Sequence, residues 1–175
     1  EYGRRIYFPR GILTQSAEAA EHAHRYDATI GIAKEGAEPM HLQSVDVHLS
    51  DLDGGNVYPY APAAGRPELR RLWRDKLRSE NPGLAEKNFG LPITTAAITH
   101  GLGLAGDLFV DPGDLVLLPD KFWGNYWLNF EVRLAGQIVT FPFYSGGGFN
   151  CEGFEASLRK ASEDREKLVV LLNFP

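Results

Sequence analysis

Apolar residues recur at helical spacing in two stretches of the chain. After Pro67, which fits a first helical turn because its missing N–H costs nothing there, the apolar stripe consists of Leu69, Leu72, Trp73 and Leu77. Arginines at positions 70, 71, 74 and 78 occupy the other faces of this predicted helix. A second stripe, ended by Gly136, consists of Trp123, Tyr126, Trp127, Phe130 and Leu134. Both patterns predict amphipathic helices.

From residue 93 onward, short apolar runs alternate with helical segments. The predicted strands are Ile93–Thr99, Leu115–Leu118, Gln137–Phe141 and Leu168–Leu172. Further helices are predicted over Leu102–Val110 and Glu152–Ala161. Fully apolar strands indicate a sheet that is buried on both faces, as parallel sheets are. The pattern therefore predicts an α/β fold with a mainly parallel sheet.

The front of the chain is less regular. Residues 16–26 are predicted as an Ala-rich helix capped by Ser16, and residues 28–33 as a brief extended run. Residues 53–66 are rich in Gly, Pro and Ala, so they are predicted as a loop. We place a domain boundary there, which divides the chain into residues 1–52 and 53–175. The three glycines at 146–148 are predicted as a flexible loop with no phosphate role.

Composition and charge exclude several classes of protein. Hydrophobic residues at 43% and charged residues at 23% are ordinary globular values. The net charge of -5 argues against a surface for nucleic acid or for an anionic membrane. No apolar run approaches the roughly 18 residues of a membrane span. The single cysteine, Cys151, suits a reducing compartment, and no histidine shows metal-ligand spacing. We expect a soluble cytoplasmic protein without a metal site.

A glycine-rich turn, Gly101-Leu102-Gly103-Leu104-Ala105-Gly106, fits the G-x-G-x-x-G pattern between a predicted strand and a predicted helix. Asp120 lies just past the next strand, close to where a ribose-binding acid is expected in a dinucleotide-binding unit. A helix start binds any phosphate, because it offers free N–H groups and a positive dipole end. The alternative is that the glycines only allow tight packing of the helix.

An aromatic cluster follows the strand at Leu115–Leu118. It includes Phe122, Trp123 and Tyr126, at the carboxyl end of the strand, where ligands bind in open α/β sheets. A tryptophan there can lie flat on an aromatic cofactor ring, whereas a dinucleotide-binding unit has no use for such a cluster. The alternative is that Trp123 belongs to the core, because it starts the apolar stripe of its helix.

Four motifs in order resemble the class I/II aminotransferases, which are fold-type-I enzymes dependent on pyridoxal 5'-phosphate (PLP). They are the run Tyr60 to Arg70 (YAPAAGRPELR), the turn Thr99-His100-Gly101, the aromatic Trp123, and the closing run Val-Leu-Leu-Asn-Phe-Pro. The resemblance covers essentially the whole chain. It implies a three-layer αβα large domain with a mainly parallel, mixed sheet, incomplete in this chain and preceded by an N-terminal arm and small-domain segment.

The resemblance also implies roles for individual residues. Ile30, Gly31 and Ile32 match the segment that lines the substrate-carboxylate side. Tyr60 matches a tyrosine that reaches across a homodimer interface to the partner's cofactor phosphate, although a loop tyrosine can also pack on its own domain. The phosphate-cradling turn corresponds to His100, Gly101 and Leu102, and the ring-stacking aromatic corresponds to Trp123. Many relatives carry a hydroxyl where Leu102 stands, so main-chain donors, helped by Thr99 or His100, would bind the phosphate.

The implied activity is the transfer of an amino group between an amino acid and a 2-oxo acid through a lysine imine. None of the six lysines matches the position of that lysine, so we expect it after Pro175 and expect this chain alone to be inactive. The apolar final run likewise leads us to expect a longer protein. Three alternatives stay open: another fold-type-I PLP enzyme (a decarboxylase, lyase or synthase), an NAD(P)-dependent oxidoreductase, and a non-enzymatic effector domain.

Overall fold

The computed structural model describes residues 2–5, 11–29, 31–36 and 38–173, and the chain divides into two compact units. One unit comprises residues 7–92, and the other comprises residues 1–6 and 93–175. The second unit contains α1 (Tyr2–Arg5), α6 (Ile98–Phe109), β3 (Leu115–Pro119), α7 (Gly124–Tyr126), the π-helix η2 (Trp127–Arg133), β4 (Gln137–Phe141), β5 (Tyr144–Ser145), β6 (Gly148–Phe149), α8 (Cys151–Ser162) and β7 (Val169–Val170).

A parallel sheet organises the second unit. Its strand order is β4-β3-β7, and both neighbours of β3 run parallel to it. The pairing of β3 with β4 begins at Leu115 opposite Gln137 and ends at Pro119 opposite Phe141. Helices connect the strands, as parallel pairing requires. The predicted strands at 115–118 and 137–141 are confirmed, whereas β7 is shorter than the predicted run 168–172.

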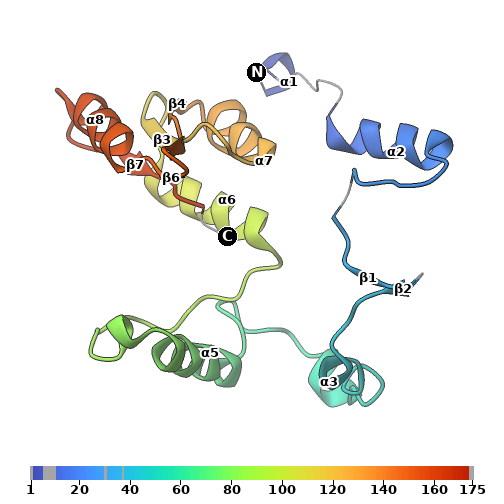
Figure 1. Cartoon of the computed structure of the whole chain (residues 1–175). Coiled ribbons are helices and arrows are strands. Elements are labelled where there is room, and N and C mark those ends of the chain that lie inside the picture. Colours follow the sequence, from blue (N-terminus) through green and yellow to red (C-terminus); the bar gives the residue numbers. More distant parts are fainter. Residues whose placement is uncertain (1, 6–10, 30, 37, 174–175) are drawn as a thin grey trace. The chain divides into compact units, whose positions relative to one another are not determined.

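Alternate residues of β3 face two different helical layers. Val116 and Leu118 are fully buried and join Val110, Tyr126 and Phe130 in the main core cluster, on the side of α6, α7 and η2. Leu117 points to the opposite face, where α8 packs on β3 and β4. The period of two along a strand therefore produces three layers from one apolar run. Figure 1 shows the sheet between these helices, so the predicted αβα architecture is confirmed.

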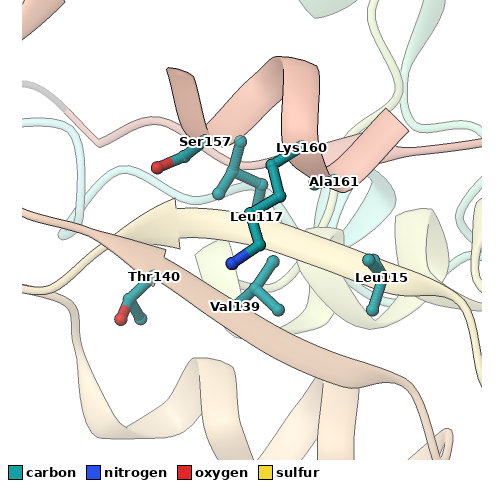
Figure 2. Close-up of a pocket in the computed structure, with 7 residues that line it drawn as sticks. All are labelled: Leu115, Leu117, Val139, Thr140, Ser157, Lys160 and Ala161. Carbon is teal, nitrogen blue, oxygen red and sulfur yellow. The ribbon is translucent and has the colours of Figure 1, made fainter. Parts of the chain in front are cut away.

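A pocket of about 370 Å³ lies between α8 and the sheet. Leu115, Leu117 and Val139 form its floor, and Ser157 and Lys160 belong to its helical side. Figure 2 shows the nitrogen of Lys160 turned toward the strands above Val139. The lining is mainly aliphatic and lies on the face of the sheet opposite to α6 and α7, so this pocket is separate from the predicted cofactor residues.

The helix predicted from the second apolar stripe forms, but part of it is wound as a π-helix. Tyr126 and Phe130 are buried, whereas Trp123 precedes the helix as its N-cap and is exposed. The helix ends at Arg133 with Leu134 as its C-cap, and Ala135 rather than Gly136 then takes the left-handed conformation, with a φ of 58°. Gly136 serves close packing instead, because a Cβ there would lie 2.9 Å from the carbonyl oxygen of Phe130.

The prediction of a strand over Ile93–Thr99 is wrong. Helix α6 already begins at Ile98, and its N-cap, Ala97, has extended dihedrals of φ -165° and ψ 177°. Ile93 is 63% exposed, and no strand of the described residues pairs with this stretch. The segment is extended at Ala97 but lacks the neighbouring strand that would give it a hydrogen-bonded ladder. The helix predicted over Leu102–Val110 is confirmed and begins four residues earlier.

The connection from β4 to α8 is a short hairpin rather than the predicted flexible loop. Strands β5 and β6 pair antiparallel across Gly146 and Gly147, whose φ values of 60° and 85° suit a tight turn of the primed type. Asn150 then caps α8 by accepting a hydrogen bond from the N–H of Gly153 at 2.9 Å. The predicted helix over Glu152–Ala161 is thereby confirmed.

The unit at residues 7–92 is built mainly of short elements. The predicted helix at 16–26 lies earlier in the chain, with Gly11 as its N-cap and Ser16 inside it. The described part of residues 28–33 carries no strand, and Asp53 caps one helical turn within the predicted loop 53–66. The elements are α2 (Ile12–His22), β1 (Lys34–Glu35), β2 (Glu38–Pro39), α3 (Gln43–Asp46), α4 (Gly54–Val57), α5 (Pro67–Glu80) and the 3-10 turn η1 (Pro82–Leu84).

Helix α5 confirms the prediction from Pro67 but reverses the expected roles of its faces. Arg70 donates from Nε to the carbonyl oxygen of Pro92 at 2.5 Å, and Arg78 lies over the ring of Phe89 at 5.2 Å. The arginine face therefore packs on the segment that follows the helix. Within the described residues the apolar stripe stays open, with Leu72 and Trp73 62% and 50% exposed.

Among the described residues, no helix has the length and apolar character needed to cross a membrane. The two compact units meet in sequence at Pro92 and Ile93. The division into residues 1–52 and 53–175 stays a prediction.

We expect Gly136→Ala to destabilise the intact protein by about 1–3 kcal/mol, the range for overpacking a core position. The added Cβ would lie 2.9 Å from a backbone oxygen, which cannot rotate away as a side chain can. Urea unfolding measures the effect. Gly148→Ala is the matched control, because no atom lies within 4 Å of its Cβ position. Equal stability of the two variants would contradict this account of Gly136.

Candidate cofactor site

Two segments of the second unit converge on the edge of the sheet where the strands end. Leu102, near the start of α6, and Phe122, which precedes α7, both pack against the core cluster around Leu118 and Tyr126. Helix α6 leads into β3 through the short turn at 110–114, so it runs back along the sheet and begins near the carboxyl ends of the strands. In α/β proteins this edge is where ligands bind.

The first turn of α6 differs in detail from the predicted phosphate turn. The N–H of Gly101 donates to the carbonyl oxygen of Ala97 at 3.1 Å, so it is not free for an anion. Helical geometry leaves the N–H groups of Ile98, Thr99 and His100 without an intrahelical acceptor. The available donors therefore lie one to three residues earlier than the glycine. The ring of His100 has a local structural contact, because its Nδ1 accepts the N–H of Ala96 at 3.2 Å.

The later glycines of the G-x-G-x-x-G pattern lie inside α6 and face η2. A Cβ on Gly106 would lie 2.5 Å from Cδ1 of Leu134 and 3.4 Å from the ring of Phe130. Gly103 lies beside Arg133, whose Nη1 would be 3.9 Å from an added Cβ. Gly106 thus allows close packing of helix on helix, which is the alternative left open by the sequence, whereas a Cβ at Gly103 would make only an ordinary contact.

Arg133 joins η2 to α6 by three hydrogen bonds and makes a fourth within η2. Its Nη2 donates to both carboxylate oxygens of Asp107 at 2.6 Å, so one nitrogen serves both oxygens. Its Nη1 donates to Oδ1 of Asn129 at 3.1 Å and to the carbonyl oxygen of Gly103 at 3.4 Å. Asn129 is only 9% exposed, and its Nδ2 has no hydrogen-bond partner among the described residues. This network was not predicted from the sequence.

Trp123 offers an open aromatic ring at this edge. It is 47% exposed, and its contact with Tyr126 is edge-on, with ring centroids 6.0 Å apart and planes at 82°. A core residue would be covered, so the structure disfavours the core interpretation of Trp123.

Asp120 binds protein groups rather than standing free. Its Oδ1 accepts the N–H of Phe143 at 2.9 Å, and its Oδ2 accepts from Nζ of Lys121 at 2.7 Å. The ammonium group of Lys121, followed by the N–H of Phe143, holds the pKa of Asp120 below its ordinary value of 3.8. Asp120 thereby fastens the segment after β4 to the end of β3. This role replaces the ribose-binding role considered from the sequence.

The other predicted site residues lie in the unit at 7–92. Tyr60 is fully exposed in the stretch between α4 and α5, and Tyr58 beside it is nearly so. Gly31 and Ile32 are exposed and belong to no helix or strand, and Ile30 lies outside the described residues. Within the part of the chain that the structure describes, no group of three or more His, Cys, Asp or Glu side chains could hold a metal ion.

Comparisons with known proteins agree on one family. The model of the family described as aminotransferase class I and II matches residues 29–174. A protein of Aquifex aeolicus, described as a probable aspartate/prephenate aminotransferase, is 33% identical over 116 residues, which cover 64% of this chain and 27% of that protein.

Solved structures show the same fold. An aminotransferase from Anaerococcus prevotii superposes with a TM-score of 0.82 at 21% identity, over 98% of this chain and 44% of that one. A kynurenine aminotransferase of Pyrococcus horikoshii, in complex with PMP, superposes with a TM-score of 0.57 at 20% identity, over 74% of this chain and 30% of that one. The chain thus spans less than half the length of these relatives.

We expect Asp120→Asn to change the stability of the intact protein in a pH-dependent way. A carboxylate whose pKa is lower in the folded protein than in the unfolded chain stabilises the folded state at pH values above the unfolded-state pKa. This stabilisation is lost as the pH falls through the folded-state pKa. The difference between wild type and variant should therefore be largest near neutral pH and shrink below about pH 4. Urea midpoints between pH 3 and pH 7 measure it. A difference that stays constant, or grows in acid, would contradict this assignment.

Proposed function

This chain belongs to the aminotransferase class I and II family, and we propose that the intact enzyme moves an amino group between an amino acid and a 2-oxo acid with PLP as cofactor. The observation that carries the proposal is that an open tryptophan and a helix start lie next to one core cluster, on which Phe122, beside Trp123, and Leu102, near the start of α6, both pack. PLP presents an aromatic ring and a phosphate, which are the two groups that such a pair suits. When bound, PLP supplies an electron sink that stabilises a substrate carbanion.

The residues at the edge fit both parts of PLP. The N–H groups of Ile98, Thr99 and His100 point out of the first turn of α6 and would hold the phosphate, favoured by the positive end of the helix dipole. The hydroxyl of Thr99 adds a donor. Leu102 contributes no side-chain donor and packs against the core instead. We therefore propose the N–H groups of Thr99 and His100 as phosphate donors, in place of those of Gly101 and Leu102.

Trp123 would orient the cofactor ring. Its ring meets that of Tyr126 at 82° rather than face to face, and it is 47% exposed, so open ring surface is available for stacking. Contact of this ring with the pyridine face would fix the plane of the cofactor and exclude water from that side. The phosphate contact at α6 and the ring contact at Trp123 together define one orientation of PLP.

Residues of the other unit would complete the site in a homodimer. We propose that Tyr60 donates its hydroxyl to the cofactor phosphate of the partner subunit, which its full exposure supports. Ile30, Gly31 and Ile32 would line the side that receives the substrate carboxylate. The single cysteine, Cys151, suits a reducing compartment, so we propose a cytoplasmic location.

Two of the sequence-based alternatives lose support. The dinucleotide-binding interpretation needs a strand before the glycines and a free acid after the next strand. The described residues provide neither, because residues 93–97 form no strand and Asp120 is bonded to Lys121 and Phe143. Another PLP-dependent reaction, such as decarboxylation, would use the same front part. The relatives that are named as aminotransferases favour amino transfer.

We expect Trp123→Ala to weaken PLP binding by roughly three- to tenfold, because one aromatic contact contributes about 0.5–1.5 kcal/mol. Titration of the apo form of the intact enzyme, followed by cofactor absorbance, measures the affinity and also shows the expected spectral shift. Trp73→Ala is the control, since Trp73 is similarly exposed but lies on α5. If both variants bind PLP as the wild type does, Trp123 does not stack on the cofactor.

For Tyr60, the expected result is looser PLP binding without loss of folding. Tyr60→Phe removes a hydrogen bond to a charged phosphate, which is about 1.5–3 kcal/mol or one to two decades of affinity. Tyr58→Phe, at a neighbouring exposed tyrosine, is the matched control and should leave the affinity unchanged.

Subunit mixing tests whether Tyr60 acts across the dimer. Inactive Tyr60→Ala subunits are combined with inactive subunits that lack the catalytic lysine. If Tyr60 acts in trans, each heterodimer has one intact site, so partial activity returns. Action within one subunit would leave both sites damaged, and no activity would be recovered. A fully active monomer would also exclude the shared site.

A further inference from the structure

The two halves of the proposed PLP site are held together by one side chain. Arg133 lies on η2, the continuation of the helix that Trp123 caps, and it bonds to α6, the helix whose first turn would hold the phosphate. We propose that Arg133 is a positioning residue, which sets the start of α6 at a fixed place relative to the Trp123 ring. The inference rests on the proposed function, because it concerns how that site is kept in register.

The geometry of the guanidinium suits this task. Nη2 donates to both oxygens of Asp107. Nη1 donates to the carbonyl oxygen of Gly103 and to the amide oxygen of Asn129. The contacts on α6 are thus one helical turn apart, so they fix its rotation as well as its distance from η2. A lysine is a point donor and cannot hold two such groups in one plane.

The backbone of α6 leaves room for this contact. The carbonyl oxygen of Gly103 accepts from Arg133, and Gly106 brings the helix close to Leu134 and Phe130. The glycines and the arginine are therefore parts of one interface. The packing at Gly106 sets the distance between α6 and η2, and the hydrogen bonds of Arg133 set the orientation of α6 relative to η2.

The π-helix supplies the other side of the interface. Within η2, Asn129 and Arg133 are four residues apart, and the amide oxygen of Asn129 accepts from the guanidinium. A π-helix is rare and is found frequently at functional sites. The buried Asn129 lies beside Arg133 on this helix, although its Nδ2 has no partner among the described residues.

General stability does not explain the network. Arg133 and Asp107 are 38% and 49% exposed at their side chains, and exposed ion pairs contribute little to stability. Orientation is a different matter, since a ligand held at two points binds well only if both points are already in place. PLP would bind at two such points, whereas an isolated phosphate would engage α6 alone.

This difference gives the test. In the apo form of the intact enzyme, Arg133→Met should weaken PLP binding about tenfold, the usual scale for hydrogen bonds of a charged group. The affinity for inorganic phosphate, measured by competition with PLP or by calorimetry, should change less than twofold. Arg133→Lys should recover only part of the PLP affinity. Arg159→Met is the control, because Arg159 makes a comparable ion pair with Glu155 on α8, across the sheet.

The outcomes separate this inference from the proposed function. Equal losses for PLP and phosphate, or a lowered Tm with unchanged affinities, would show that Arg133 is merely structural and overturn the inference. If the wild type binds no PLP at all, the proposed function itself fails. If Arg133→Met does not fold, Asp107→Ala provides the same comparison, because it removes the carboxylate that accepts from Arg133 and leaves the carbonyl oxygen of Gly103 as an acceptor. There too, selective loss of PLP affinity supports the inference and unchanged PLP affinity contradicts it.

Discussion

The close contact of α6 with η2 determines how the helices and the sheet of the second unit are arranged. At Gly106 the two helices approach so closely that even a methyl group would meet Leu134. This approach buries Phe130 against Val116 and Leu118 of β3 and leaves α8 to cover the opposite face. The same contact brings the start of α6 and the Trp123 loop to one edge of the sheet. A change at this contact would therefore alter both the core and the proposed site.

Patterns that depend on local chemistry could be predicted from the sequence. The apolar runs of β3 and β4, the Pro67 start of α5 and the helix α8 all lie close to their expected positions. The stretch at Ile93 has the composition of a strand but lacks a partner, and a strand exists only through its neighbour. The prediction for the faces of α5 was wrong, because periodicity cannot show that an arginine will donate to the carbonyl groups of Leu91 and Pro92.

The proposed site was predictable to a similar extent. Trp123 was singled out because an aromatic residue after a buried strand lies where ligands bind in open α/β sheets, and the glycines drew attention to the start of α6. Their roles in the site stay predictions. The packing of Gly106 against Leu134 and Phe130 could not be predicted, since it depends on which helix lies opposite α6. No feature of the sequence singled out Arg133. Its partners Gly103 and Asp107 lie 30 and 26 residues away in the chain and meet it only in the fold.

The most direct test is borohydride reduction of the intact enzyme with PLP, followed by peptide mapping. Reduction fixes the cofactor to the lysine that holds it, so mass spectrometry identifies that lysine. We predict a pyridoxyl group on one lysine that is none of Lys34, Lys76, Lys87, Lys121, Lys160 and Lys167. The wild type should lose its visible cofactor absorbance in the same step. A stoichiometric label on one of these six lysines, or no labelled peptide at all, would contradict the account.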